Sequence, residues 1–246
     1  MPPIRRQTTA QGYLGGTASF RTDLYTGRGT LLTFEESIKL NQKLGVKHTP
    51  ELKGGDPARI AAIFGSQAAY AQAAIDELKV AGVKPKEVWL QSFDLNDVLY
   101  CVQNAPDYGK QAVYLDDIEP GNPAFPRLTF AELQAIKAQG VRIFAPPIPA
   151  LLAVNANNEI VPSQYALDIK RAGLDIITWS FERSDLRRGA SAAGFYWAFD
   201  PQGKAVKKDS DMFKALDVLA RNVRILGIFS DWPATVTYYA NCMGLK

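Results

Sequence analysis

Histidine is nearly absent from this chain of 246 residues, which has a single one, His48. A Ser/His/Asp nucleophile needs a histidine within hydrogen-bond reach of its serine, so that type of active site is excluded for residues such as Ser92. Cysteine is almost as scarce, because Cys101 and Cys242 are the only two. Two cysteines form neither a metal cluster nor a disulfide framework. We interpret each most simply as a small buried residue, and a bridge between them stays open as an alternative.

Long apolar runs and a strong net charge are also lacking. No window approaches about 18 uninterrupted apolar residues. The charged start at residues 1–7 is followed by no apolar stretch, so we expect neither a membrane span nor a signal peptide. The 28 basic and 25 acidic side chains give a net charge of +3. The basic pairs are scattered and lack interleaved aromatic residues, so we expect no nucleic-acid partner.

What the chain does contain is a repeated alternation of strand and helix patterns. Apolar runs predict strands at 46–53, 87–93, 111–115, 141–146, 174–179 and 226–231. One helix pattern, at 33–44, precedes the first strand, and others follow the strands at 56–82, 94 onward, 129–140, 163–173, 211–222 and 232 onward. Several begin with caps, among them Asp56 before Pro57, Asp94, and a capping box from Thr129 to Glu132. Strands that alternate with helices predict parallel βαβ crossovers with both sheet faces covered.

Six such units are two short of a closed (β/α)8 barrel. One domain of residues 1–246 fits the length, because α/β barrels of about 250 residues form a single core. By count alone, a doubly wound open sheet fits as well. No Gly-rich phosphate loop follows the first strand, however, which disfavours a dinucleotide-binding version. We interpret the long segment 183–210 as a loop insertion.

The predicted strand at 46–53 carries a carboxylate and an ammonium on one face. Side chains two residues apart share a face, so Thr49, Glu51 and Lys53 point one way. His48 and Leu52 point the other way, which puts the only histidine on the opposite side from the Glu51–Lys53 pair. On position alone, this pair fits an ion pair in a barrel lumen as well as it fits a functional role.

Polar residues gather at the carboxyl ends of the predicted strands, where barrel enzymes place their chemistry. They are Glu51 and Lys53, Gln91, Ser92 and Asp94, Asp116 and Asp117, Trp179 and Glu182, and Asp231. Structural explanations compete at some of these positions. Asp94 suits a helix cap, and Asp116 with Asp117 suits the start of a solvated loop.

Four short motifs resemble those of glycerophosphodiester phosphodiesterases in order and spacing, over about residues 13–245. They are TPELK at 49–53, QSFD at 91–94, AGLDIITW at 172–179 and GIFSDWP at 227–233. The resemblance implies a metal-dependent TIM (β/α)8-type barrel, of which this chain supplies strands 3 to 8. It also implies hydrolysis of a small-molecule glycerophosphodiester to an alcohol and glycerol 3-phosphate, in lipid and glycerol metabolism.

The same resemblance implies roles for individual residues. Glu51 matches a carboxylate ligand of the divalent metal, Ca²⁺ or Mg²⁺, and Lys53 matches the group that neutralises the phosphate. Trp179 matches the aromatic residue that packs against the glycerol. Three further residues, Gln91, Ser92 and Asp231, line the same mouth. A metal and an ammonium together suit the negative charge of a phosphodiester in its transition state.

Other motifs of the resembled family have no counterpart in this sequence. These are the His-Arg pair of its first strand, the Glu-x-Asp of its second and a further histidine. One carboxylate cannot hold Ca²⁺, which takes about six to eight oxygen ligands, or Mg²⁺, which takes about six. We therefore expect an amino-terminally truncated chain that is inactive alone and binds the metal only weakly. Full-length proteins of this type are often periplasmic or secreted.

Two alternatives stay open. In the first, the chain is a non-catalytic module that binds a phosphate or glycerol ligand, with 183–210 as a lid that carries Arg187 and Arg188. The competing explanation for that segment is an insertion whose aromatic residues pack on the barrel rim. The second alternative is an unrelated α/β sheet, which is tested by whether Lys53 and Asp231 lie across one cavity.

An incomplete barrel also has a structural consequence. The strands at 46–53 and 226–231 would have unpaired edges, and apolar surface beside them would lack its covering helices. We therefore expect marginal stability or self-association through these edges.

Overall fold

The computed structural model describes residues 29–118 and 126–245, and the chain separates into two units. The first unit, residues 1–33, contributes only residues 29–33 to this description, and they adopt neither helix nor strand. The second unit, residues 34–246, contains every element described below.

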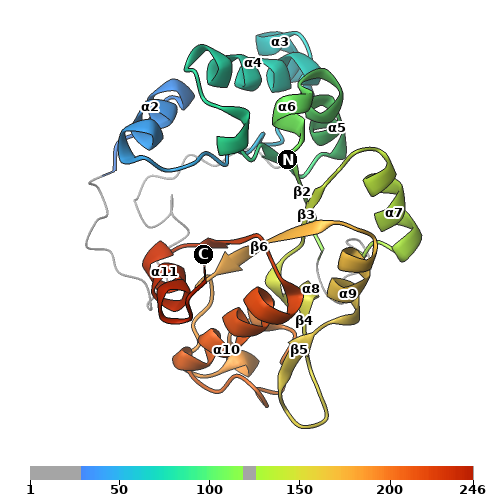
Figure 1. Ribbon diagram of the computed structural model, residues 1–246, viewed down its shortest axis with the longest axis vertical. Helices are drawn as coiled ribbons and strands as arrows, with labels where there is room; N and C mark the ends of the chain where they lie inside the picture. The colour runs from blue at the N-terminus through green and yellow to red at the C-terminus, as the bar shows by residue number, and fades with distance from the viewer. Residues whose placement is uncertain (1–28, 119–125, 246) are drawn as a thin grey trace. The chain divides into compact units, whose positions relative to one another are not determined.

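A five-stranded parallel sheet organises the second unit (Figure 1). Its strands, in spatial order, are β1 (Gln91–Ser92), β2 (Val113–Leu115), β3 (Ile143–Ala145), β6 (Asp175–Phe181) and β7 (Gly227–Ser230). Spatial order follows chain order throughout, whereas a doubly wound sheet reverses direction at a switch point. The described sheet is therefore wound in one direction, as in the wall of a barrel, and the predicted parallel α/β fold is confirmed.

The first predicted strand, 46–53, is shorter and more interrupted than the sequence suggests. It runs parallel to the chain leading into β1 and forms isolated bridges between His48 and Val88 and between Glu51 and Gln91. The backbone N–H groups of His48 and Leu52 donate to carbonyls of that neighbour, each at 2.8 Å. Between them lies Pro50, which has no N–H to donate, so the hydrogen-bond ladder is interrupted there.

Helices and short turns connect the strands. The α-helices are α2 (Phe34–Leu44), α3 (Pro57–Phe64), α4 (Gln67–Val80), α5 (Leu95–Asn104), α6 (Pro106–Gly109), α7 (Phe130–Ala138), α8 (Ile148–Leu151), α9 (Gln164–Arg171), α10 (Met212–Asp217) and α11 (Pro233–Cys242). The 3-10 helices are η1 (Pro85–Glu87), η2 (Ala190–Ala192), η3 (Phe195–Trp197) and η4 (Asp209–Asp211), and η5 (Val218–Val223) is a short π-helix. The predicted caps are confirmed, because Asp56 and Asp94 accept from backbone N–H groups and Thr129 forms a capping box with Glu132.

Besides the first strand, three elements differ from the sequence prediction. The helix expected over 56–82 is two helices, because Gly65 adopts a positive φ of 88° and Ser66 then caps α4 through the Ala69 N–H. The helix expected over 211–222 is α10 continued by the short π-helix η5. The turn expected at 155–158 joins an antiparallel hairpin of β4 (Leu152–Val154) and β5 (Ile160–Pro162), which was not predicted. Of the two cysteines, Cys101 is buried as expected, whereas Cys242 is exposed, and both are free thiols.

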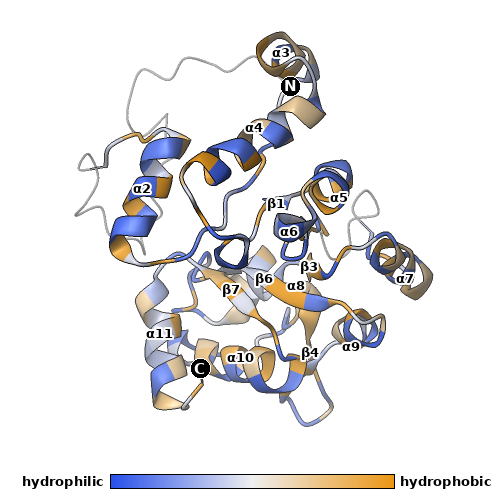
Figure 2. Cartoon of the chain, turned by 45° about the horizontal axis from the view of Figure 1, so that its top comes forward, coloured by the Kyte–Doolittle hydropathy of each residue, from blue (hydrophilic) through white to orange (hydrophobic). Residues whose placement is uncertain are grey.

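Apolar side chains cover both faces of the sheet, as the near-continuous apolar strands predict. On one face, Phe144 and Ile176 pack among the helices in the main core. On the other, a smaller cluster is formed by Val113, Leu115, Ile143 and Ala145, with Trp89, Ile177 and Trp179 packed against it. Hydropathy colouring shows β3 and β6 as largely apolar (Figure 2). Alternation along each strand therefore determines which residues face the smaller cluster. At the strand ends, the residues of the same parity continue that face.

Candidate ligand-binding site

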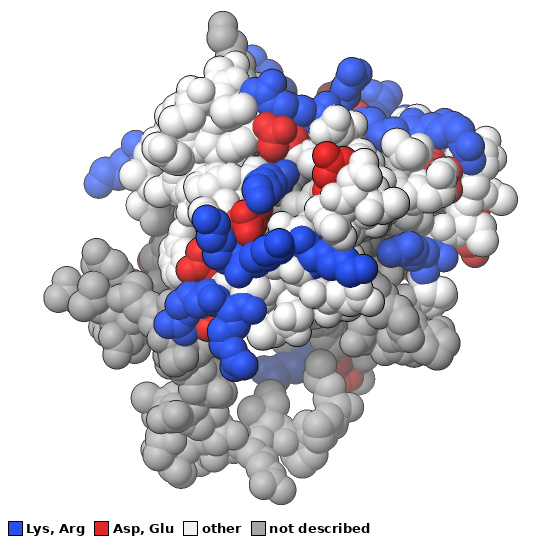
Figure 3. Space-filling model, turned by 90° about the horizontal axis from the view of Figure 1, so that it is seen from below, with Lys and Arg blue, Asp and Glu red and all other residues white. Residues whose placement is uncertain are grey.

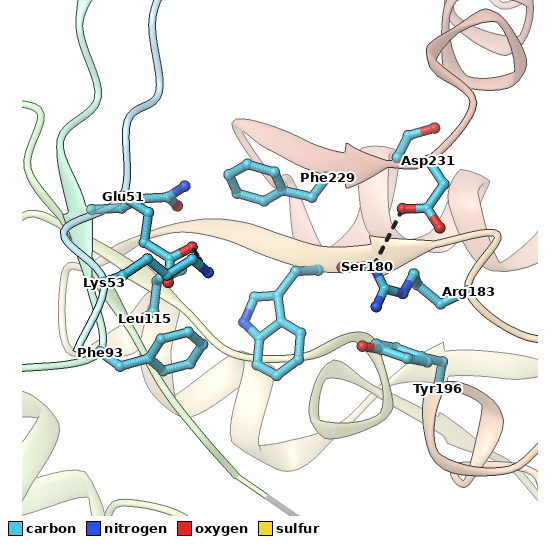
Figure 4. Close-up of a pocket in the computed structure, with 12 residues that line it drawn as sticks. Glu51, Lys53, Phe93, Leu115, Ser180, Arg183, Tyr196, Phe229 and Asp231 are labelled. Carbon is cyan, nitrogen blue, oxygen red and sulfur yellow. Dashed lines mark ion pairs between the residues drawn. The ribbon is translucent and has the colours of Figure 1, made fainter. Parts of the chain in front are cut away.

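A pocket of about 320 Å³ lies at the carboxyl ends of the strands. We call it the strand-end pocket. Its lining residues are Glu51, Lys53, Gln91, Phe93, Leu115, Trp179, Ser180, Arg183, Tyr196, Phe229, Ser230 and Asp231 (Figure 4). Lys53 and Asp231, which come from the first and last strand positions, line this one cavity. That is the arrangement that distinguishes a barrel-type mouth from an unrelated sheet.

Glu51 and Lys53 lie together on one side of the strand-end pocket (Figure 4). The Lys53 ammonium is 2.7 Å from the Glu51 carboxylate. Glu51 is largely buried with 19% of its side chain exposed, whereas Lys53 is 74% exposed. The ion pair is therefore anchored at its acidic end, and its basic end reaches solvent and the pocket opening.

Gln91 and Ser92 are neighbours on β1 but face opposite sides. Gln91 lines the pocket and is only 6% exposed. Its Nε2 donates to the Thr49 carbonyl at 3.3 Å. Its Oε1 has no hydrogen-bond partner among the described residues. Ser92 faces away and donates to the Asp97 carboxylate at 2.8 Å. The strand alternation thus brings Gln91 into the pocket and places Ser92 outside its lining.

Trp179 is held in an aromatic cluster at the end of β6. Its indole N–H donates to the Ala145 carbonyl at 2.8 Å, which fixes the ring orientation. Phe93 and Tyr196 meet the ring edge-on, with centroids 5.8 and 6.2 Å away, and Phe195 stacks on it at 6.3 Å. These contacts form a rigid apolar wall on the pocket.

Arg183 was missed by sequence reasoning, although it follows β6 by two residues. Its guanidinium lies 3.6 Å from the Asp231 carboxylate, on the side of the pocket away from Lys53 (Figure 4). The strand ends behind it are tied together, because Ser230 donates to the Glu182 carboxylate at 2.7 Å. A cation just past the end of a predicted strand was the signal in the sequence, and it was passed over in favour of the Arg187–Arg188 pair.

The segment 183–210 delivers Tyr196 to the pocket and keeps Arg187 outside it. The buried Asp200 carboxylate accepts the backbone N–H groups of three successive residues, 204 to 206, at 2.8 to 2.9 Å. Beside it, the Trp197 side chain is 1% exposed. Arg187 instead forms a two-point contact with Asp185, and these hydrogen bonds hold the Asp185 pKa at about 2. Neither Arg187 nor Arg188 lines the strand-end pocket.

Charges elsewhere on the surface occur in mixed groups. Lys and Arg predominate on the face shown in Figure 3, with Asp and Glu interspersed among them. Several of the basic groups are paired locally, such as Lys214 with Asp211 and Arg221 with Asp217. The prediction of no nucleic-acid partner stays a prediction.

The described residues do not fit the divalent metal that the sequence resemblance implied. Among residues 29–118 and 126–245, no three His, Cys, Asp or Glu side chains come together as a ligand set. Glu51 is already neutralised by Lys53, and the pocket contains a second cation in Arg183. His48 is 4% exposed on the opposite face, where burial lowers its pKa. Both carboxylates of the pocket, Glu51 and Asp231, already pair with a cation. The site therefore suits an anion that competes for Lys53 and Arg183 rather than Ca²⁺ or Mg²⁺.

One buried carboxyl lies outside the pocket lining. Asp116 follows β2, is 8% exposed, and accepts the Tyr165 hydroxyl at 3.2 Å. Burial raises the Asp116 pKa to about 7, and the neighbouring Asp117 charge adds to the effect. The expectation that Asp116 begins a solvated loop is therefore wrong for Asp116, because burial places it in the protein interior, while Asp117 is exposed.

A fungal relative matches the chain along almost its whole length. It is a protein of Arthroderma benhamiae named "Extracellular protein", 41% identical over 242 residues, which are 98% of this chain and 98% of the relative. The chain belongs to the same family as this protein. No family model matches the chain.

Three solved structures show a related fold. The first is a protein of Silicibacter pomeroyi assigned to the glycerophosphoryl diester phosphodiesterases, with a TM-score of 0.56 and 20% identity. Glycerophosphodiester phosphodiesterases of Parabacteroides distasonis and Galdieria sulphuraria give TM-scores of 0.53 and 0.54 at 16% and 15% identity. These similarities cover 86 to 87% of this chain but only 57 to 66% of the solved chains. The chain thus has an α/β fold like that of these proteins, over about three-fifths of their length.

Within the described residues, no helix combines the length and the apolar character needed to cross a membrane.

Proposed function

We propose that the strand-end pocket binds the phosphate and glycerol parts of a small glycerophosphodiester. The observation that supports this most directly is the placement of two cations, Lys53 and Arg183, on opposite sides of one pocket beside the Trp179 wall. Two cations suit the anionic phosphate, and the indole face suits the carbons of glycerol. The buried Gln91 Oε1, which lacks a partner among the described residues, is available to accept a glycerol hydroxyl.

Hydrolysis of the ligand is the second candidate function, and the similar fold of the solved phosphodiesterases favours it. That chemistry requires a divalent metal and groups that transfer protons, and general acid–base catalysis typically contributes about 10² to 10⁴ in rate. Of the expected metal ligands, the described residues provide Glu51 alone, and the sequence has no histidine besides His48. We therefore propose binding rather than hydrolysis for this chain. We also propose that it acts outside the cell, on the basis of the relative's name.

Calorimetric titration tests the binding proposal. We expect glycerophosphocholine and glycerol 3-phosphate to bind with dissociation constants in the micromolar to millimolar range, corresponding to roughly 4 to 8 kcal/mol. Binding should persist in EDTA, because Lys53 and Arg183 rather than a metal hold the phosphate. Free glycerol serves as the control ligand without charge and should bind far more weakly.

A choline-release assay with Ca²⁺ or Mg²⁺ separates the two candidate functions. We expect no turnover above the buffer rate. Turnover that a Glu51→Gln substitution abolishes would establish the catalytic function instead. Absence of binding to every phosphate-containing ligand would overturn both functions.

A further inference from the structure

A second cavity of about 300 Å³ lies behind the strand that carries Glu51. We call it the outer cavity. Its walls are mostly apolar and come from α2, the strand segment 50–52, the α3–α4 pair and the residue before β1, through Phe34, Leu52, Phe64, Tyr70, Ala73 and Leu90. Phe64 and Tyr70 pack against each other with ring centroids 4.8 Å apart. Glu51 and Glu77 are the charged residues of a lining that is otherwise apolar or aromatic. Such a surface suits an apolar occupant.

The two cavities meet at one residue. Glu51 lines both the strand-end pocket and the outer cavity, while the buried Leu52 beside it faces the outer cavity alone. The rim formed by Glu51 and Lys53 therefore separates a compartment that contains two ion pairs from a mostly apolar one by the thickness of a single strand. A ligand that spans this rim needs an anionic end and an apolar end.

Helix α3 borders this rim and is unusually apolar for an exposed helix. None of its residues is buried, and Ile63 and Phe64 are 64% and 39% exposed. Figure 2 shows the helix mostly in the hydrophobic colours. Three residues, Gly54, Gly55 and Asp56, separate it from Lys53, and Gly65 follows it. Exposed apolar side chains beside a cavity mark a place where apolar ligand surface is covered.

We propose that the ligand is a single-chain amphiphile, with its phosphodiester head in the strand-end pocket and its acyl chain in the outer cavity. This inference rests on the proposed binding function and adds the apolar substituent to it. The shared wall at Glu51 favours one ligand over two unrelated ones, because an apolar chain attached to the glycerol has its shortest path over this rim. On binding, α3 covers the chain with Phe64 and Ile63.

The experiment compares two ligands that differ only in the chain. Monodecanoyl glycerophosphocholine, kept below its critical micelle concentration, and chainless glycerophosphocholine are titrated calorimetrically into the 246-residue protein. The acyl chain is expected to tighten binding by roughly tenfold or more. An Ala73→Phe substitution fills the outer cavity and should remove this gain while affinity for the chainless ligand is unchanged. Ala68→Phe is the matched control, because Ala68 is exposed on the same helix and lines neither cavity.

Each outcome is informative. Equal affinities for the two ligands in the wild type would overturn the acyl-chain site and leave the head-group proposal standing. Loss of binding to both ligands in the wild type would overturn the proposed function itself. A gain that survives Ala73→Phe but disappears in Ile63→Ser would assign the effect to contact between α3 and lipid surface, and would overturn the cavity as the chain site. Unchanged binding of the chainless ligand shows that the Ala73→Phe variant is folded.

Discussion

The Lys53 ammonium lies 2.7 Å from the Glu51 carboxylate, on the same face of one strand. A carboxylate in this position is the single metal ligand that the resemblance to phosphodiesterases assigns to the described residues. Its partner, however, is a lysine of the same chain rather than other carboxylates. Lys53 can therefore bind an incoming phosphate only in competition with Glu51.

Substitutions at this pair distinguish an anion site from a metal site. Lys53→Gln removes the cation for which Glu51 and the phosphate compete, and we expect the affinity for glycerol 3-phosphate to fall roughly tenfold. Glu51→Gln frees Lys53, and we expect unchanged or tighter binding. Calorimetry in EDTA and then in Ca²⁺ measures both effects. If Glu51 held a metal, Glu51→Gln would instead abolish any gain in affinity that Ca²⁺ produces.

Arg183 should matter to the ligand, whereas Arg188 should not. Arg183 lines the strand-end pocket beside Asp231, so Arg183→Gln is expected to weaken phosphate binding several-fold, and less so at high salt because the side chain is half exposed. Arg188→Gln is the matched control in the same segment and should leave affinity unchanged. Titration of both variants at two salt concentrations gives the comparison. Equal losses in the two variants would show a diffuse electrostatic effect and contradict the assigned pocket.

Stability should fall as the pH rises toward neutrality, and Asp116 is the cause. Its pKa of about 7 in the folded protein lies above the ordinary value of 3.8. Between pH 3.8 and pH 7, the folded state therefore keeps a proton that the unfolded state has released, and raising the pH favours the unfolded state. The penalty is complete above pH 7 and amounts to at most about 4 kcal/mol, from about 1.4 kcal/mol per unit.

The substitution Asp116→Asn checks this assignment. It removes the titrating group and keeps an acceptor for the Tyr165 hydroxyl, so the variant should lose most of the pH dependence between about 4 and 7. Urea unfolding at several pH values measures the free energy. Asp117→Asn is the exposed control and should retain most of the slope. A wild-type stability that does not change across this range would contradict the raised pKa.

Self-association should occur through the two outer strand positions. Among the described residues, β7 pairs only with β6, and the segment 48–52 pairs only with the chain around β1. A space of about 570 Å³ between them is lined by apolar residues including Trp89 and Ile228, and Leu226 is 58% exposed at this edge. We expect dimers or larger species at high protein concentration.

A charge placed at the same edge tests this expectation. Leu226→Lys should shift sedimentation toward the monomer, because charged side chains on an outer strand oppose pairing between chains. Leu167→Lys, at an exposed leucine on α9, is the control and should leave association unchanged. A wild-type protein that is monomeric at all concentrations would contradict the prediction.

Local chemistry explains which parts of the fold were predictable. Caps such as Asp94 and Thr129 mark helix starts through hydrogen bonds to their own neighbours, so the sequence contains the whole interaction. The break between α3 and α4 was missed because an alanine-rich pattern continues across Gly65, and only the positive φ of that residue reveals the end of α3. The interruption of the first strand depends on which carbonyl lies opposite Pro50, and this is a tertiary relationship.

The candidate site was predictable to the extent that strand alternation determines it. Glu51, Lys53, Gln91, Trp179 and Asp231 share the pocket because each lies at the inward-facing parity of its strand end. Ser92 was included with Gln91 by resemblance, although one residue along a strand reverses the facing direction. Tyr196 reaches the pocket only because Asp200 and Trp197 fix the segment behind it, which no local pattern encodes.

The strand-end pocket is assembled from residues near both ends of the described chain, with Glu51 and Lys53 at one and Asp231 at the other. A ligand held between them binds only when every intervening strand is in place. Its binding free energy therefore adds to the free energy of unfolding of the whole fold. The protein should therefore become markedly harder to digest with proteases when ligand is present, by a protection that grows as the logarithm of ligand concentration.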